Sequence, residues 1–299
     1  MYDFYSGVCC LNQKKALNPL SLMTGALKRN SLKHFTPKIT IYLDKKHYIV
    51  KTAENARELH EALRLRHDVF LEELLHKRRK SKLDVDHFDR RCDHLLIIDK
   101  RSNKLIGTYR LQSSLFTRRW YTATEFHMKQ IRKLPGNKLE LGRACVHPDF
   151  RNGVTIALLW EGIHAYMLAS DTRYMFGCSS IKTMDKDEIG HIYNYLKQQN
   201  HLTDELKVRP KGKYRIFGLH RHLKKHPRFH SNIEAADITG KIPGLLQSYL
   251  KVGAKVCGRP ALDKSFRCID FLTLLDVTEL RQQYLRRTAS AQPVKTAVK

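Results

Sequence analysis

The residues from 139 to 153 have the composition of a strand, a turn and the start of a helix. In such a connection the backbone N–H groups of the turn and the positive end of the helix dipole form a site for an anion such as phosphate. Arg151 would add positive charge there, and Gly153 would let the backbone approach the ligand closely. An ordinary strand-to-helix connection containing Pro148 would look the same, so both interpretations stay open.

Glu140 and Arg143, in the same stretch, are candidates for proton transfer and for carboxylate binding. They are three positions apart, so on a regular strand their side chains would face opposite sides of the sheet. Only a β-bulge between them would bring both to one site.

The segment 84–94 concentrates acidic side chains ahead of an apolar, β-rich run. A calcium loop would need a glycine at its turn position and an uninterrupted set of oxygen ligands, whereas basic residues are interleaved here. We therefore expect no metal. The segment is expected either to hold a cationic amine or to form a structural loop pinned to Arg66.

Cys145 could be a nucleophile, with His147 close by in the sequence. Its apolar neighbours favour instead a small side chain buried in the core. The seven cysteines are scattered and form no C-x-x-C pair, so we expect neither a disulfide scaffold nor a zinc ribbon. This cysteine usage is typical of a reducing, cytoplasmic compartment.

The chain carries 55 lysines and arginines against 29 acidic residues, a formal net charge of +26. This balance predicts an anionic partner. Basic residues are dense at 77–82, 118–119 and 207–228. No apolar run approaches the ~18 residues that a transmembrane helix requires. The hydrophobic content of 42% excludes a wholly disordered chain.

The periodicity of apolar residues predicts a mixed sheet with helices on both faces. We expect strands at 39–43, 47–50, 94–98, 104–111, 139–146, 174–178, 254–257 and 268–275, and helices at 53–76, 155–167, 185–198, 243–253 and 277–286. Thr52 is the expected N-cap of the first helix. We assign 1–45 to a basic extension with one short helix near 17–27, 46–287 to one domain and 288–299 to a disordered tail.

Short motifs in a fixed order cover residues 46–280. They lie at 64–70, 86–89, 92–96, 107–111, 124–126, 140–143, 158–163, 176–180, 242–250, 253–257, 260–263, Phe266 and 270–272. Together they resemble the hemolysin-type branch of the GNAT acyltransferase superfamily, which includes ornithine Nα-acyltransferases and N-acyl amino acid synthases. The resemblance implies an α/β fold with a mixed, mostly antiparallel central sheet, a splayed central pair of strands and flanking helices. It identifies 46–287 as a GNAT-like N-acyltransferase domain.

The resemblance also implies a reaction. A fatty or 3-hydroxy fatty acyl group would pass from acyl carrier protein to the α-amino group of an amino acid, with ornithine expected first. The product would be an N-acyl amino acid (lyso-ornithine lipid) for aminolipid synthesis. The amine would attack the thioester directly, without cofactor, metal or covalent enzyme intermediate.

The chemistry that this reaction requires suggests the site residues. Catalytic roles fall on Glu140 and Arg143, with Glu140 either the general base or the partner of an arginine. Substrate-binding roles fall on Arg66, Phe70, Asp86, Asp89, Tyr109 and Arg110. The phosphopantetheine of the donor would meet Cys145, Val146, Arg151, Asn152 and Gly153. Arg66, Arg110 and Arg143 are alternatives for binding the acceptor carboxylate, or for forming a network with Asp86 and Asp89.

The turn departs from the usual GNAT pattern, R-x-x-G-x-G or R-x-x-G-x-A, because Gly153 comes one place early and Ile156 replaces the last small residue. This favours a carrier protein, which brings one phosphate, over coenzyme A, which brings a pyrophosphate. The basic segments would dock an acidic carrier protein or contact the anionic inner membrane. We expect a cytoplasmic enzyme, peripheral at that membrane, that does not bind nucleic acid.

Two alternative functions stay open. Acyl-homoserine lactone synthases resemble this chain at several of the same site positions and use S-adenosylmethionine as acceptor, but they usually lack the block at 242–272. A non-enzymatic protein that binds nucleic acid or anionic lipid would account for the charge, although no recognised nucleic-acid-binding motif is present.

Overall fold

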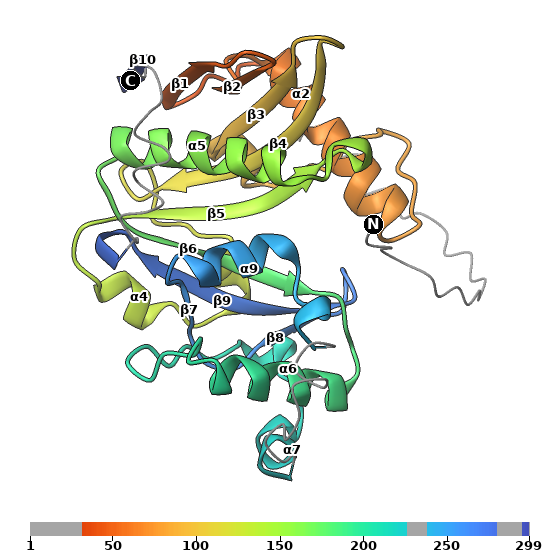
Figure 1. Cartoon of the computed structure of the whole chain (residues 1–299), viewed down its shortest axis with the longest axis vertical. Coiled ribbons are helices and arrows are strands. Elements are labelled where there is room, and N and C mark those ends of the chain that lie inside the picture. Colours follow the sequence, from red (N-terminus) through yellow and green to blue (C-terminus); the bar gives the residue numbers. More distant parts are fainter. Residues whose placement is uncertain (1–31, 226–237, 280–294, 299) are drawn as a thin grey trace.

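One sheet organises the molecule (Figure 1). The computed structural model describes residues 32–225, 238–279 and 295–298. Within them the strands lie in the order β10-β1-β2-β3-β4-β5-β6-β9-β7, with β8 paired to β9. Their bounds are β1 Ile39–Asp44, β2 Tyr48–Thr52, β3 Asp93–Asp99, β4 Lys104–Ser113, β5 Asn137–Val146, β6 Thr172–Ile181, β7 Lys255–Val256, β8 Ala261–Asp263, β9 Cys268–Asp276 and β10 Lys295–Val298. The described pairs are antiparallel apart from β5–β6, which confirms the expected mixed, mostly antiparallel sheet.

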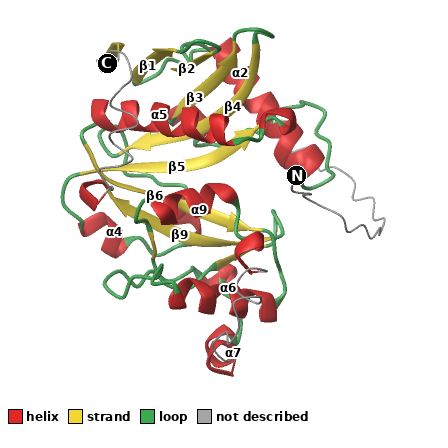
Figure 2. Cartoon of the chain, in the orientation of Figure 1, coloured by secondary structure: helices red, strands yellow, loops and turns green. Residues whose placement is uncertain are grey.

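Helices cover both faces of the sheet (Figure 2). The core on one face joins α5 (Gly153–Ala169) and α9 (Gly244–Lys251) to Leu95 and Ile97 of β3. The core on the other face joins α2 (Ala56–Arg66) to Leu96. This alternation is the two-residue period of a strand that is buried on both sides. The remaining α-helices of the described residues are α3 Thr122–Glu125, α4 Lys129–Lys133, α6 Lys186–Gln198 and α7 Leu219–Lys225.

The strands β5 and β6 run parallel and then separate. Their paired residues end at Glu140 and Phe176. Beyond this point β5 continues beside β4, and β6 continues beside β9. This separation matches the splayed central pair of strands that the resemblance implies, and it divides the sheet into two halves.

A β-bulge in β5 redirects Arg143. The register between β4 and β5 shifts between Thr108 and Arg110, and Arg143 has a left-handed backbone with φ 54°. This conformation costs a non-glycine residue about 1 kcal/mol or more. The bulge places Arg143 on the same side of the sheet as Arg110, and so meets the condition for Glu140 and Arg143 to share a site.

The expected boundary at residue 45 falls in the turn of a hairpin. β1 pairs with β2, and Leu32 and Phe35 are buried against α2. The expected helix at 17–27 lies outside the described residues. Most of the expected disordered tail, 288–299, also lies outside them, but Lys295–Val298 forms β10 and pairs with β1. The free edge of β1 forms backbone hydrogen bonds with this segment. Local composition does not reveal a pairing between residues so far apart in the sequence.

The expected helix at 53–76 is two elements. Asn55 caps α2 by accepting the N–H groups of Arg57 and Glu58, whereas Thr52 ends β2. A π-helical turn, η1 (His67–Glu73), follows, in which the Leu74 N–H donates to the carbonyl of Val69. The last expected helix, 277–286, is a 3₁₀ turn, η5 (Val277–Glu279), as far as the described residues extend. No helix in the described ranges is both long enough and apolar enough to span a bilayer.

Candidate functional site

A buried network of arginines and aspartates lies beside β4 and β5. Arg66, which is 1% exposed, donates from Nη2 to Asp84 Oδ2 at 2.7 Å and from Nη1 to Asp89 Oδ1 at 2.7 Å. Arg110 donates to Asp86 at 2.7 Å and to Asp89 at 3.1 Å. Burial alone would raise the pKa of Asp89, but Arg66 and Arg110 hold it well below its usual range. The sequence left two roles open for these arginines, binding the acceptor carboxylate or pairing with aspartates. In the structure Arg66 and Arg110 pair with aspartates.

Arg143 lies at the edge of this network and is less tightly held. Its Nη2 is 3.3 Å from Asp86 Oδ2, and its buried Nε has no hydrogen-bond partner within the described residues. The guanidinium carbon lies 4.8 Å from the ring centre of Tyr121 and 5.1 Å from that of Phe266. Phe70 of η1 meets Phe266 edge-on, with the ring centres 6.4 Å apart. Arg143 therefore keeps donor capacity that Arg66, whose Nε, Nη1 and Nη2 all bind aspartates, has already used.

Glu140 holds a loop in place. Its carboxylate accepts the backbone N–H groups of Tyr121 at 2.8 Å and Thr122 at 2.6 Å, at the start of α3. Burial raises the pKa of Glu140, although its hydrogen bonds with Thr122 and Tyr121 act in the opposite direction. The partners found are backbone amides, whereas the non-catalytic alternative drawn from the sequence was an arginine side chain.

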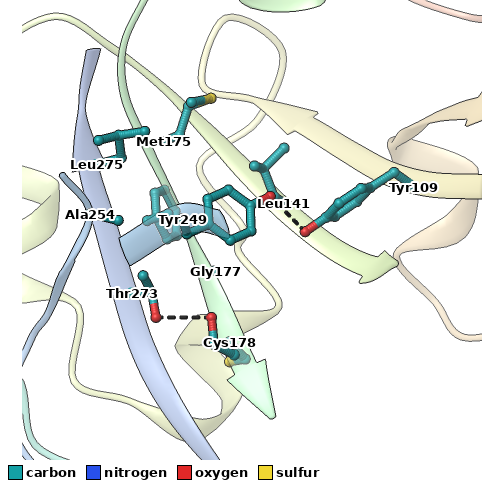
Figure 3. A pocket seen from close by; sticks show the side chains of 11 residues that line it. Tyr109, Leu141, Met175, Gly177, Cys178, Tyr249, Ala254, Thr273 and Leu275 are labelled. Atoms are coloured by element: carbon teal, nitrogen blue, oxygen red, sulfur yellow. Dashed lines mark hydrogen bonds between the residues drawn. The ribbon is translucent and has the colours of Figure 1, made fainter. Parts of the chain in front are cut away.

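A pocket with about 300 Å³ of empty space, open to solvent, lies where β5 and β6 separate (Figure 3). Tyr109 of β4 and Tyr249 of α9 line it, with their hydroxyl oxygens 2.9 Å apart. Burial raises the pKa of Tyr109 to about 12, so its hydroxyl stays protonated. The other lining residues are Leu141, Met175, Phe176, Gly177, Cys178, Ser179, Ala254, Thr273 and Leu275. Most of these side chains are apolar, and the tyrosine, serine and threonine hydroxyls make the lining partly polar.

The structure separates two neighbours that the sequence grouped in one substrate site. Tyr109 and Arg110 are consecutive on β4, so they point to opposite faces of the sheet. Tyr109 lines the pocket under α9, and Arg110 enters the aspartate network.

A cluster of three buried carboxylates was missed by the sequence reasoning. Glu125 at the end of α3, Asp263 of β8 and Asp270 of β9 each offer an oxygen within 4.8 Å of the others. Burial, and then the neighbouring Asp270, raise the pKa of Glu125 to about 8. Cys178 connects the cluster to the pocket, because it lines the pocket and its Sγ lies 3.6 Å from Glu125 Oε2. One signal was available, namely an aspartate at 270 in the otherwise apolar strand 268–275.

The turn after β5 contains most of the expected phosphopantetheine residues. Arg151 donates two hydrogen bonds of 2.6 Å to Glu73, so its charge is paired. Asn152 caps α5 by accepting the Thr155 N–H at 3.0 Å. A side chain on Gly153 would meet no atom within 4 Å, so packing does not require glycine there. The N-terminus of α5 is the feature of this turn that suits an anion.

Cys145 is a buried core thiol. It is 3% exposed, and its Sγ donates to the carbonyl oxygen of Leu65 at 3.6 Å. Burial raises the pKa of the thiol far above its usual value, so no thiolate is available. The adjacent Val146 packs against the main apolar core, and its carbonyl accepts from Arg151 Nε at 3.3 Å.

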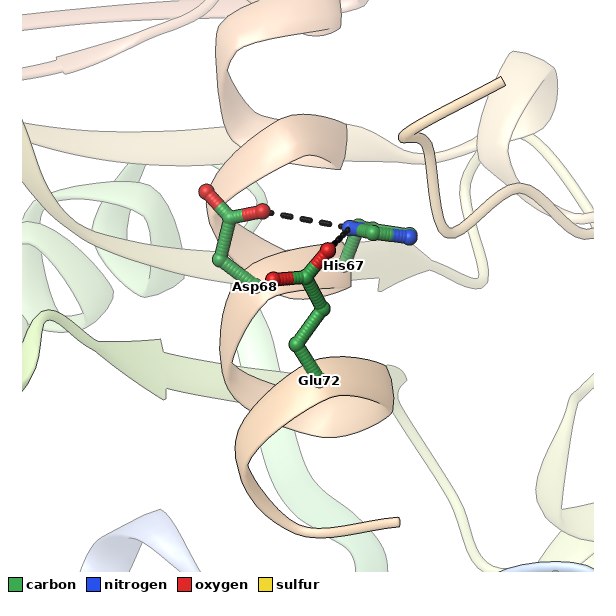
Figure 4. A group of neighbouring side chains, drawn as sticks. All are labelled: His67, Asp68 and Glu72. Atoms are coloured by element: carbon green, nitrogen blue, oxygen red, sulfur yellow. Dashed lines mark hydrogen bonds and ion pairs between the residues drawn. The ribbon is translucent and has the colours of Figure 1, made fainter. Parts of the chain in front are cut away.

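His67, Asp68 and Glu72 also lie within metal-ligand distance of one another (Figure 4). His67 Nε2 accepts the backbone N–H of Arg79 at 3.2 Å, which assigns the proton to Nδ1. Nδ1 faces Asp68 at 3.1 Å and Glu72 at 3.9 Å. Both ring nitrogens are therefore in use, and the group anchors the basic segment 77–82 to η1.

Sequence comparison relates the chain to known acyltransferases. The family model described as an acetyltransferase (GNAT) domain matches residues 65–161. The chain is 30% identical over 249 residues to the L-ornithine N(alpha)-acyltransferase of Rhizobium meliloti (strain 1021), covering 79% of this chain and 82% of that protein. It is 29% identical over 256 residues to the enzyme of the same name from Rhodobacter capsulatus, covering 80% and 95% of the two chains.

Solved structures show a looser likeness. An N-acyl amino acid synthase from uncultured soil microbes aligns with a TM-score of 0.44 and 10% identity, over 82% of this chain and all of that one. A CoA-dependent acyl-homoserine lactone synthase, solved with SAM and isopentyl-CoA, aligns with a TM-score of 0.43 and 17% identity, over 78% and 80% of the two chains.

Proposed function

Because the chain belongs to the L-ornithine Nα-acyltransferase family and is an N-acyltransferase, we propose that it acylates the α-amino group of ornithine, with acyl carrier protein as the donor of a long or 3-hydroxylated fatty acyl group. The product would be the N-acyl amino acid precursor of an ornithine-type membrane lipid.

The position of the pocket is the observation that carries this proposal. It lies where β5 and β6 separate, and Cys178 joins it to the carboxylates on the other face of the sheet. A thioester in the gap would have an apolar lining on one side and charged groups on the other. An acyl donor and a charged amino acid can thus meet from opposite faces.

Arg143 is our candidate for binding the acceptor carboxylate. Arg66 and Arg110 are almost fully buried and are bound to aspartates at 2.7 Å, whereas Arg143 has longer contacts, 3.3 Å to Asp86 and 3.8 Å from Nε to Asp84, and its Nε makes no hydrogen bond among the described residues. Guanidinium groups bind carboxylates through two parallel hydrogen bonds. Phe70 and Phe266 would form the apolar wall beside this contact.

The chemistry requires a neutral amine. A base first removes a proton from the α-ammonium group, and the amine then attacks the thioester carbon. The C–N bond forms, the C–S bond breaks, and the second proton that the nitrogen loses passes to the carrier thiolate, which leaves as a thiol. Glu140 is the proposed base, directly or through a water, because burial raises its pKa and its carboxylate has lone pairs beyond the two that accept N–H groups.

The phosphopantetheine arm of the acyl donor would lie along the edge of β5 that faces the space between β5 and β6. Pairing with β6 ends at Glu140 among the described residues, so the following backbone groups of β5 can bond to pantetheine amides and to the developing oxyanion. The N-terminus of α5 would receive the single phosphate of the carrier protein. The basic segment 77–82, anchored next to this helix through η1 and Glu73, would meet its acidic surface.

A reaction mixture analysed by mass spectrometry tests the proposal. It contains pure protein, 3-hydroxyhexadecanoyl carrier protein, and ornithine, lysine, glycine, glutamine and S-adenosylmethionine. We expect N-acyl ornithine as the main product. A parallel mixture with the coenzyme A thioester tests the donor. An acyl lactone would overturn the acceptor assignment, and thioester consumption at the background rate with long and short chains would overturn the proposed reaction.

A further inference from the structure

Glu125, Asp263 and Asp270 form a group of buried carboxylates without a bound cationic side chain. Their residues are 0%, 4% and 3% exposed. Among the ion pairs shorter than 4 Å in the described ranges, the buried ones join Asp84, Asp86 and Asp89 to arginines and leave this cluster out. Arg143 is close enough to lower the pKa of Asp270, but burial outweighs it. Burial raises the pKa of Glu125 and Asp270, so these carboxyl groups hold protons when no cation is bound, and a bound cation would stabilise their ionised forms.

Several oxygens of the cluster accept hydrogen bonds from neighbouring groups. Asp263 Oδ1 accepts the N–H groups of Ser265 at 2.7 Å and Phe266 at 3.3 Å, and Asp270 Oδ1 accepts the hydroxyl of Ser180. Glu125 Oε2 faces the Cys178 thiol. Glu125 Oε1, in contrast, is buried and meets no donor at hydrogen-bond geometry within the described part of the chain, although the side chains of Tyr121 and Asp270 lie close enough to shift the pKa of Glu125. A buried acceptor left open is a place for a donor that the protein does not supply.

We infer that Glu125, Asp263 and Asp270 bind the side-chain ammonium group of a diamino acid acceptor and so select it over neutral amino acids. The inference rests on the proposed function and adds to it the residues that determine acceptor specificity. An alkylammonium group has three N–H donors, and the cluster offers one carboxylate from each of three elements.

The position of the cluster fits an amino acid held at both ends. Asp263 accepts from Phe266, whose ring lies under the Arg143 guanidinium. Cys178 joins Glu125 to the pocket at the opening of the strands. An acceptor with its carboxylate on Arg143 and its side-chain ammonium on the cluster would direct its α-amino group toward this opening. The aspartates of the arginine network cannot replace the cluster, because arginines already neutralise them.

The test compares ornithine with 2-aminopentanoate, which has the same carbon chain but no side-chain amine. The variants are Asp270→Asn and Glu125→Gln, both close in shape to the protonated acid that burial favours. We expect each to lower kcat/KM for ornithine at least about tenfold while 2-aminopentanoate changes less than about twofold. Asp276→Asn, at the end of β9 and paired with Arg173, is the matched control and should change neither value.

Equal losses with both amino acids would overturn the inference in favour of a structural role, and unchanged kcat/KM for ornithine would overturn it outright. If the wild-type protein acylates amino acids without preferring ornithine to 2-aminopentanoate, the inference fails and the proposed function stands. If it acylates no amino acid, the proposed function itself fails.

Binding without acyl donor provides a second readout. Ornithine should raise the melting temperature of the wild-type protein and of Asp276→Asn, but not that of Asp270→Asn or Glu125→Gln. Calorimetry in two buffers of different ionisation enthalpy should show protons released as ornithine binds, since the ammonium favours the ionised carboxylates. A shift with magnesium or calcium alone that EDTA removes, and none with ornithine, would identify the cluster as a metal site and overturn the inference.

Discussion

A side chain on Gly177 would place its Cβ 2.2 Å from the carbonyl oxygen of Leu141, far inside van der Waals contact. These two residues lie just beyond the last pair of the parallel strands, where β5 and β6 begin to separate. The absence of a side chain at 177 therefore sets how close the strands come at the base of the pocket.

Gly177→Ala should force the strands apart and lower the free energy of unfolding by about 1–3 kcal/mol, the usual cost of overpacking. Acyl transfer should fall as well, since both residues line the pocket. Thermal melting measures the first effect. Gly153→Ala, where the added Cβ meets nothing within 4 Å, is the control and should melt at or above the wild-type temperature. Equal melting temperatures for Gly177→Ala and wild type would contradict the close contact.

Glu140→Gln separates proton transfer from loop support. If Glu140 is the base, kcat should fall about 100-fold or more, with the KM for carrier protein unchanged. The melting temperature should also fall, because the new amide places a donor against the N–H groups of Tyr121 and Thr122. Steady-state kinetics beside thermal melting reports both. A lower melting temperature with unchanged kcat would remove Glu140 from the chemistry and leave it as the anchor of α3.

Charge reversal at Lys77, Arg78 and Arg79 should raise the KM for acyl carrier protein severalfold, and more strongly at low salt, where screening is weak. The kcat should hardly change. Arg101→Glu with Lys104→Glu, at the exposed turn between β3 and β4, is the matched control. A KM that does not depend on salt, or the same rise in the control, would argue against docking at 77–82.

Cys145→Ala should keep most of the activity, because the buried thiol donates to Leu65 and is not ionised. We expect a loss of unfolding free energy of about 1 kcal/mol from the small cavity. Intact-protein mass spectrometry during turnover should find no acyl group on the wild-type chain. A covalent acyl adduct that disappears in Cys145→Ala would refute direct attack on the thioester.

Glu125 should make the folded state less stable as pH rises. Its pKa is about 8 in the folded protein, above the usual value of 4.5, so the folded state holds a proton that the unfolded state releases. The free energy of unfolding therefore declines between about pH 4.5 and pH 8 and then levels off with respect to this group. In Glu125→Gln this decline should be smaller. Melting curves across this range, for both proteins, measure the difference, and parallel curves would contradict the raised pKa.

Apolar runs and motif order were enough to predict most strands and the mostly antiparallel sheet. An apolar run such as Leu95 to Ile97 can be recognised from neighbouring residues alone. The sequence showed only that Glu140 and Arg143 need a bulge between them to share a site. Whether the bulge forms depends on how β5 pairs with β4. The π-helical turn interrupts a pattern that is continuous in the sequence. β10 could not be predicted, because its pairing with β1 joins opposite ends of the chain.

The candidate site was predictable residue by residue but not in its arrangement. Arg66, Asp86 and Asp89 were expected near one another, yet only the fold shows that the aspartates neutralise the arginine. Asp270 was hidden because an apolar strand is read as core, and its partner Glu125 lies in a distant connection. Buried polar clusters of this kind depend on tertiary contacts that composition does not encode.

The pairing of β10 with β1 sets the order in which the sheet can be completed. Ribosomes deliver β1 early and β10 last, so the outer edge of β1 has no partner from its own chain while the intervening residues are made. An unpaired strand edge is a template for pairing with other chains. During synthesis Ile39–Asp44 thus keeps an unpaired strand edge until β10 has been made and pairs with it.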